Sequence, residues 1–178
     1  VILIDGTISN KFFYEAVKET FSQTAKEYIE ENPTIYFRFG AVLYRDLAYS
    51  IENNNDKKYY PLFEDLTDDI ETIQSFFNKL NTRGGGIKLA NDWESGYFAV
   101  LNKMSWNDNA EKIVVHLTNV PGHGTNYTMR TEWHKNYFNV PKFHNCTDFQ
   151  KNFKTYKKFQ DRQKGRMYSI IIKLAKRT

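Results

Sequence analysis

The sequence predicts an α/β fold with a mostly parallel, doubly wound sheet and helices on both faces. The chain opens on a continuous apolar run that ends at Asp5, and a long amphipathic segment follows at once. This is the pattern of a buried parallel strand that leads through a turn into a helix. Apolar runs and helical patterns then alternate along the chain. The 178 residues, 40% hydrophobic and 16% aromatic, suffice for one such domain, so we expect residues 1–178 to form a single domain.

Each expected element rests on a local pattern. The expected elements are strands at residues 1–5, 35–43, 59–63, 113–118 and 168–174, and helices at residues 10–30, 67–82, 91–104 and 147–163. In the strands apolar residues run on or alternate, and in the helices they recur every three or four residues. Asn32-Pro33 ends the first helix, and Pro61 marks the third strand as an edge strand. Thr67 should cap the second helix, and Thr147 the fourth.

Three of these helices should turn a defined apolar side toward the sheet. In the first helix this side consists of Phe12, Phe13, Ala16, Val17, Phe21, Tyr28 and Ile29. In the second it consists of Ile70, Ile73, Phe77 and Leu80, and in the third of Trp93, Tyr97, Val100, Leu101 and Met104. His116 lies within an apolar strand, and we interpret it as a core or sheet-face histidine rather than a ligand.

Three polar residues lie directly after the first strand. The side chains of Asp5, Thr7 and Ser9 alternate on one short loop. In an open α/β sheet, ligands bind beyond the carboxyl ends of the strands, where this loop should lie. One carboxylate and two hydroxyls are oxygen ligands that suit a hard divalent cation. The simpler interpretation, an Asp-Gly turn followed by a Thr or Ser helix cap, stays open on these residues alone.

The Asp-x-Thr-x-Ser spacing resembles the metal-ion-dependent adhesion site of von Willebrand factor A (vWA) domains, which have a Rossmann-like fold. The later motifs are similar to those of the A-like domains attached to alpha-type protein kinases. These motifs are Tyr44-Arg45-Asp46, the glycine loop of residues 84–92 before Trp93, and the Asn-Val-Pro-Gly-His-Gly of residues 119–124. The resemblance covers nearly the whole chain, although we expect the family's final strand and helix to be absent after residue 174. A phosphatase of the haloacid-dehalogenase type is excluded, because Leu3 stands at its nucleophile position.

The resemblance implies a magnesium site with a surrounding rim. The metal ligands that it implies are Asp5, Thr7, Ser9 and Asn119. The rim residues that it implies are Asp46, Lys88, Asp92 and His123.

Two departures from the family lower the negative charge at this site. Lys88 stands in the glycine loop where the branch has an acidic residue, and Asn119 stands where the family has aspartate. Asp5 is then the one sure carboxylate, whereas a protein-bound Mg²⁺ usually takes one or two together with water. A nearby ammonium also repels a divalent cation. We therefore expect this point to hold water or the Lys88 ammonium more often than a tightly bound Mg²⁺.

The resemblance implies a protein–protein recognition module rather than an enzyme. In such a module the rim binds an acidic side chain of a partner through the open position of the metal. The alternative is a regulatory or docking domain of a larger enzyme, such as an alpha-type kinase. The residues themselves contain no Ser/His/Asp or Cys/His grouping with the context for nucleophilic catalysis.

Composition bears on nucleic-acid binding, on disulfide bonds, on membrane spans and on cellular location. The net charge of +4 is modest and spread along the chain, so nucleic-acid binding is not favoured. Cys146 is the only cysteine, which excludes an intrachain disulfide. No run of about 18 apolar residues is present, so we expect no membrane span. No signal peptide is visible, and an intracellular location is slightly favoured.

Overall fold

The computed structural model describes residues 1–45, 61–82, 93–119 and 165–171; for residue 94 and residues 165–171 it describes the backbone alone. These residues form a five-stranded sheet with helices packed on it, so the expected α/β class is confirmed. The strands are β1 (Ile2–Asp5), β2 (Phe39–Tyr44), β3 (Leu62–Thr67), β4 (Lys112–Thr118) and β5 (Gly165–Ile171). The helices are the 3₁₀ turn η1 (Ile8–Asn10), α1 (Lys11–Glu31), α3 (Ile70–Lys79) and α4 (Trp93–Asn102).

The central strand of the sheet is β1, in the order β3-β2-β1-β4-β5. It pairs in parallel with β2 and β4, and β4 pairs in parallel with β5. The outer strand β3 runs antiparallel to β2, so the edge strand expected near Pro61 is present. Because β1, β2 and β4 are parallel, their carboxyl ends meet along one side of the sheet, which we call the carboxyl edge. The loop after β1 and the residue after β4 therefore lie together.

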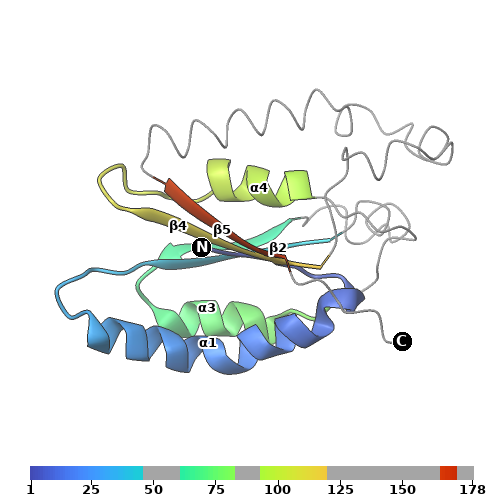
Figure 1. Cartoon of the computed structure of the whole chain (residues 1–178), viewed down its shortest axis with the longest axis horizontal. Coiled ribbons are helices and arrows are strands. Elements are labelled where there is room, and N and C mark those ends of the chain that lie inside the picture. Colours follow the sequence, from blue (N-terminus) through green and yellow to red (C-terminus); the bar gives the residue numbers. More distant parts are fainter. Residues whose placement is uncertain (46–60, 83–92, 120–164, 172–178) are drawn as a thin grey trace, which may run out of the picture.

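Helix α4 covers one face of the sheet (Figure 1). The buried side chains between them are Leu3, Val42, Tyr44, Leu66, Ala99, Val100, Met104 and Val114. Gly96 lets the helix approach the strands closely, since a Cβ there would lie 2.8 Å from Cδ1 of Tyr44 and 2.9 Å from Cδ1 of Leu3. This contact accounts for a glycine inside a helix, where glycine costs about 1 kcal/mol relative to alanine.

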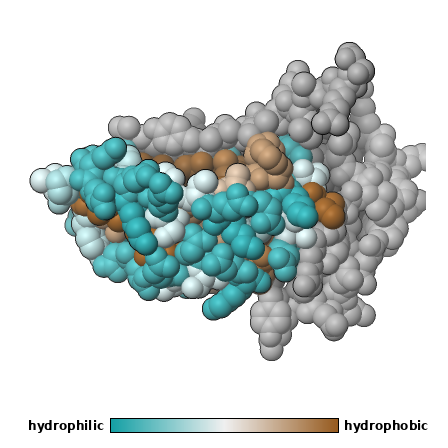
Figure 2. Space-filling model, turned by 90° about the horizontal axis from the view of Figure 1, so that it is seen from below, coloured by the Kyte–Doolittle hydropathy of each residue, from teal (hydrophilic) through white to brown (hydrophobic). Residues whose placement is uncertain are grey.

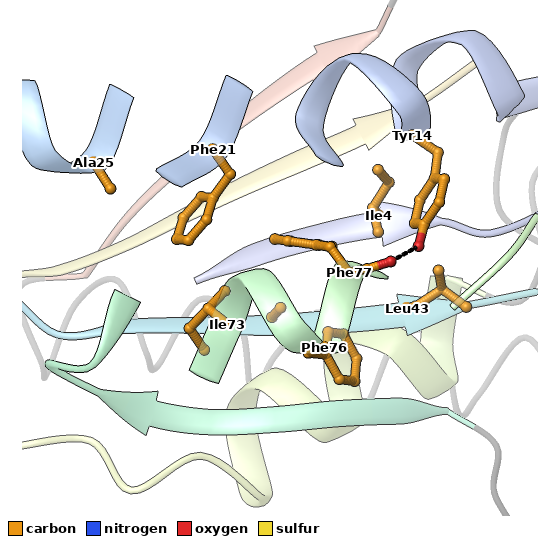
Figure 3. Packing of buried hydrophobic residues seen from close by; sticks show 9 residues of the cluster. Ile4, Tyr14, Phe21, Ala25, Leu43, Ile73, Phe76 and Phe77 are labelled. Carbon is orange, nitrogen blue, oxygen red and sulfur yellow. Dashed lines mark hydrogen bonds between the residues drawn. The ribbon is translucent and has the colours of Figure 1, made fainter. Parts of the chain in front are cut away.

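Helices α1 and α3 cover the opposite face (Figure 1). Figure 3 shows the aromatic and aliphatic side chains that these helices pack against Ile4 of β1 and Leu43 of β2. The hydroxyl of Tyr14 is buried here and donates toward the carbonyl oxygens of Phe77, at 2.5 Å, and Leu80, at 2.8 Å. The outer surface of this face is mostly hydrophilic, with hydrophobic atoms mainly at its margins (Figure 2).

The expected apolar side of α1 is partly wrong. Phe12 and Tyr28 are 78% and 52% exposed, and Ala16 is exposed as well. The residues that α1 buries are Tyr14, Phe21 and Ala25. Tyr14 does not look like a core residue in the sequence, but its hydroxyl finds carbonyl partners at the end of α3, which removes the cost of burying it. The helix is therefore rotated relative to the expected side.

Several element boundaries also differ from the expectation, and β2 begins at Phe39 instead of residue 35. Strand β3 covers Leu62–Thr67 instead of residues 59–63, and Thr67 ends that strand instead of capping the next helix. Asp69 is the cap of α3, and its side chain accepts a hydrogen bond from the Glu71 amide. Strand β5 begins at Gly165 instead of residue 168. The helix expected at residues 147–163 lies outside the described residues.

None of the described helices combines the length and the apolar character needed to cross a lipid bilayer.

Candidate functional site

The loop after β1 turns sharply at the carboxyl edge. Asp5 ends the strand, fully buried, and the Gly6 amide donates to the carbonyl oxygen of Tyr44 at 2.7 Å. Gly6 also lies against Leu43, because a Cβ on this residue would stand 2.5 Å from Cδ2 of the leucine. No other residue fits this position without a shift of the Leu43 side chain. The glycine thus allows the loop to lie directly against β2, and the following residues cross the end of the sheet.

The sequence-predicted residues of this loop contact one another. The Thr7 amide donates to Oδ1 of Asp5 at 2.9 Å, which is an Asx turn. The hydroxyl oxygens of Thr7 and Ser9 are 3.1 Å apart. Across the edge, the Ser9 hydroxyl lies 3.5 Å from Oδ1 of Asn119, and Nδ2 of Asn119 donates to the Ser9 carbonyl oxygen at 3.1 Å. The structure therefore brings Asp5, Thr7, Ser9 and Asn119 together at one point.

Sequence reasoning missed Thr118, the last residue of β4. Its hydroxyl lies 3.4 Å from Oδ2 of Asp5, and the residue is only 2% exposed. Strand alternation was the signal that could have found it: in β4, Thr118 lies on the same face of the sheet as His116. Asp5 thus receives a backbone amide on one carboxylate oxygen and a hydroxyl on the other, and these two contacts fix the orientation of its side chain.

The side-chain oxygen atoms that meet here are the type of ligand that a small hard cation prefers. Adjacent ligands of an octahedral Mg²⁺ at about 2.1 Å stand about 3 Å apart, close to the separation of the Thr7 and Ser9 hydroxyls. A Mg²⁺ at this point would be held by Asp5, Thr7, Ser9 and Asn119, and it would supply an open position for an anionic group. The set contains one carboxylate, so its charge is low for a divalent ion.

The four expected rim residues, Asp46, Lys88, Asp92 and His123, lie outside the described residues. Of the Tyr44-Arg45-Asp46 motif, Tyr44 and Arg45 are described. Arg45 is 6% exposed, and its Nη2 donates to the Asn81 carbonyl oxygen at 3.0 Å. Within the described ranges, no three His, Cys, Asp or Glu side chains gather in a way that would hold a metal.

A buried polar cluster lies on the α4 face, directly behind this edge. His116 is fully buried, and Tyr44 Oη lies 2.8 Å from its Nε2 and Tyr97 Oη 2.8 Å from its Nδ1. The Trp93 ring packs edge-on against the imidazole at 4.9 Å. Burial lowers the pKa of His116 to about 3, so the ring is neutral at physiological pH. The interpretation of His116 as a core histidine is confirmed.

Asn10 is a second residue that sequence reasoning missed. It follows Ser9, caps α1 by position, and is 1% exposed. Neither its side-chain oxygen nor its side-chain nitrogen makes a hydrogen bond. Most buried amides have a partner, so this one is unusual. It lies in the same short segment as the hydroxyls of the candidate site.

No protein-family model and no curated protein matches this chain. Among solved structures, the chain is similar to the pilus adhesin SpaC from Lactobacillus rhamnosus GG in an open conformation, with 16% sequence identity and a TM-score of 0.49. The match covers 67% of this chain and 14% of the adhesin, so the chain spans a small part of that protein's length. A likeness at this level says nothing about what this chain does.

Proposed function

We propose that this chain is a recognition module of the von Willebrand A type, which binds an acidic group of a protein partner at the carboxyl edge. The observation that carries the proposal is the meeting of Asp5, Thr7 and Ser9 with Asn119, which is 110 residues from Ser9 in the sequence. The doubly wound arrangement of such a domain is part of the proposal. It is supported by the central position of β1 and by the helices on both faces.

In this proposal a divalent cation is a weak and exchangeable member of the site. Oxygen ligands from Asp5, Thr7, Ser9 and Asn119 hold it, and the carboxylate of the partner completes its coordination. A single carboxylate compensates only one of the ion's two positive charges, which weakens binding of the free ion. The same excess positive charge favours an incoming acidic side chain.

The location of the ion is tested by nuclear magnetic resonance with trace Mn²⁺, which broadens the signals of nearby amides even when binding is weak. We expect selective broadening of the amides of residues 6–9 and Asn119 in the wild type. The isosteric variant Asp5→Asn removes the only described carboxylate of the site and should abolish this broadening. The matched control Asp108→Asn removes an exposed carboxylate in the turn before β4, at the other end of the sheet, and should leave it unchanged. Broadening centred elsewhere, or unaffected by Asp5→Asn, would rule the site out.

A further inference from the structure

We propose that Ile8, Lys11 and Phe12 form a docking shelf for a peptide segment of the partner that carries a carboxylate next to a bulky apolar side chain. We call these three residues the rim shelf. They flank Ser9, an exposed residue of the candidate site, in the sequence and in the same turn of chain. The inference rests on the proposed function, since it takes the same edge of the molecule, and it adds which side chains select the partner.

The rim shelf exposes large apolar side chains where the fold does not need them. Ile8 is 60% exposed and Phe12 is 78% exposed, although Tyr14 and Phe21 of α1 are buried. Phe13 packs edge-on against Phe12 with ring centroids 5.7 Å apart, and this contact limits the movement of the exposed ring. Apolar side chains held in place at the margin of a polar site are typical of binding surfaces.

The charge of this segment favours an acidic partner. Lys11 is exposed and forms no ion pair with any residue in the described part of the chain. The first turn of α1 contains no acidic residue. The amino end of a helix carries partial positive charge because its peptide dipoles are aligned, and α1 has 21 residues. The ion pair that α1 does make, between Lys26 and Glu71, lies about four turns away.

The start of α1 also has unused hydrogen-bonding capacity. Asn10, at the start of α1, does not cap the helix with a side-chain hydrogen bond. The buried side-chain amide of Asn10 makes no hydrogen bond, through either its nitrogen or its oxygen. A buried amide without a partner costs about 1–3 kcal/mol. This observation is independent of the exposed apolar residues, and it leaves one side-chain donor and one side-chain acceptor unused at the start of α1.

The small apolar area argues for a peptide and against a second copy of this chain. A stable protein interface buries about 800 Å² on each partner. Two side chains of the size of Ile8 and Phe12 supply at most about half of that area. The surface seen in Figure 2, over α1 and α3, is mostly hydrophilic. One apolar side chain beside one carboxylate matches both the area and the charge of the rim shelf.

The experiment is a selection from a displayed library of random linear peptides against the wild-type protein in buffer with Mg²⁺. The expected result is enrichment of sequences in which Asp or Glu adjoins Leu, Ile, Phe or Met. The enriched peptides are then synthesised and titrated into Phe12→Ala and Lys11→Glu, each of which should weaken binding about tenfold or more. The matched controls are Tyr36→Ala, which removes a 74% exposed aromatic ring before β2, and Lys103→Glu after α4; both should bind like the wild type.

The outcomes separate this inference from the proposed function. Loss of binding in Phe12→Ala with no effect of a chelator supports the rim shelf and contradicts the ion. Loss of binding in chelator with normal binding by Phe12→Ala and Lys11→Glu overturns the rim shelf and keeps the ion site. No enrichment, enrichment without an acidic–apolar pair, or concentration-dependent dimerisation lost in Phe12→Ala also overturns the rim shelf.

Discussion

At the scale of single residues, the local half of the candidate site was predictable and the distant half was not. Asp5, Thr7 and Ser9 lie within five residues, so a turn after an apolar strand suffices to place them together. Asn119 joins them only because β4 pairs with β1. Its inclusion came from a family resemblance. Thr118 and Asn10 were missed because Ser, Thr and Asn side chains have many ordinary roles at turns and caps.

The partners of His116 are likewise distant in the sequence and could not be predicted from it. An apolar strand predicts that the histidine is buried, but its partners Tyr44 and Tyr97 are 72 and 19 residues away. Each hydroxyl meets one ring nitrogen, so a neutral imidazole donates to one tyrosine and accepts from the other. Protonation would place a charge in this cluster with no carboxylate partner among the described contacts of the ring. The cluster is therefore matched to the neutral histidine.

This arrangement predicts a pH dependence of stability. The pKa of His116 is about 3 in the folded protein and 6.5 in the unfolded chain, so the unfolded state binds the proton more tightly. The stability from keeping the ring neutral is complete above pH 6.5 and is lost as the pH falls toward 3. Between pH 7 and pH 5 the free energy of unfolding should fall by about 2 kcal/mol from this residue.

Urea unfolding at the two pH values measures this loss. The variant His116→Gln cannot titrate but keeps a donor and an acceptor, and the other histidines are unchanged in it. Its free energy of unfolding should fall by about 2 kcal/mol less than that of the wild type over the same range. Equal losses in the two proteins would mean that the imidazole is not buried in a neutral state.

At the scale of elements, α1 and α3 were predictable as helices, but their contact was not. Helical spacing of apolar residues identifies α3, and its expected residues Ile73 and Phe77 are buried. In α1, apolar residues occur on more than one side, so periodicity alone does not decide which side is buried. The buried side of α1 is the one that carries Tyr14, whose hydroxyl donates to carbonyl groups at the end of α3 (Figure 3).

The Tyr14 hydroxyl therefore contributes to the packing of the two helices. Its pKa is raised to about 12, first by burial and then by the charge of Glu15, so the hydroxyl keeps its proton at neutral pH and donates. Tyr14→Phe should lower the free energy of unfolding by about 1–3 kcal/mol, because it removes a donor from buried carbonyl groups. Urea unfolding at pH 7 measures the change.

The control for this prediction is Tyr28→Phe on the same helix. Tyr28 is 52% exposed, and no hydrogen bond of its hydroxyl is described. Removing that hydroxyl should change the free energy of unfolding by less than about 0.5 kcal/mol. If both variants lose the same stability, the contact between Tyr14 and the end of α3 does not hold these helices together.

At the scale of the whole molecule, the class of fold follows from the alternation of strands and helices, and the site follows from the order of strands. Periodicity indicated that β1 is buried, but only its pairing with both β2 and β4 brings the carboxyl ends of three strands to one edge. The antiparallel direction of β3 was not anticipated beyond its place at the edge. Such long-range pairings depend on contacts between distant residues, which no local pattern contains.

The central claim is that the carboxyl edge is a cation-dependent recognition site that lacks one carboxylate. Calorimetric titration of Mg²⁺ and Mn²⁺ into the wild type, Asn119→Asp and the charge-matched control Asn109→Asp tests it most directly. Asn119 contacts Ser9, whereas Asn109 is exposed in the turn at the other end of β4. A carboxylate at position 119 should strengthen binding by about 1–4 kcal/mol. We expect weak binding by the wild type and by Asn109→Asp, and clear tightening in Asn119→Asp alone. Micromolar binding by the wild type, or equal affinities in the two variants, would contradict it.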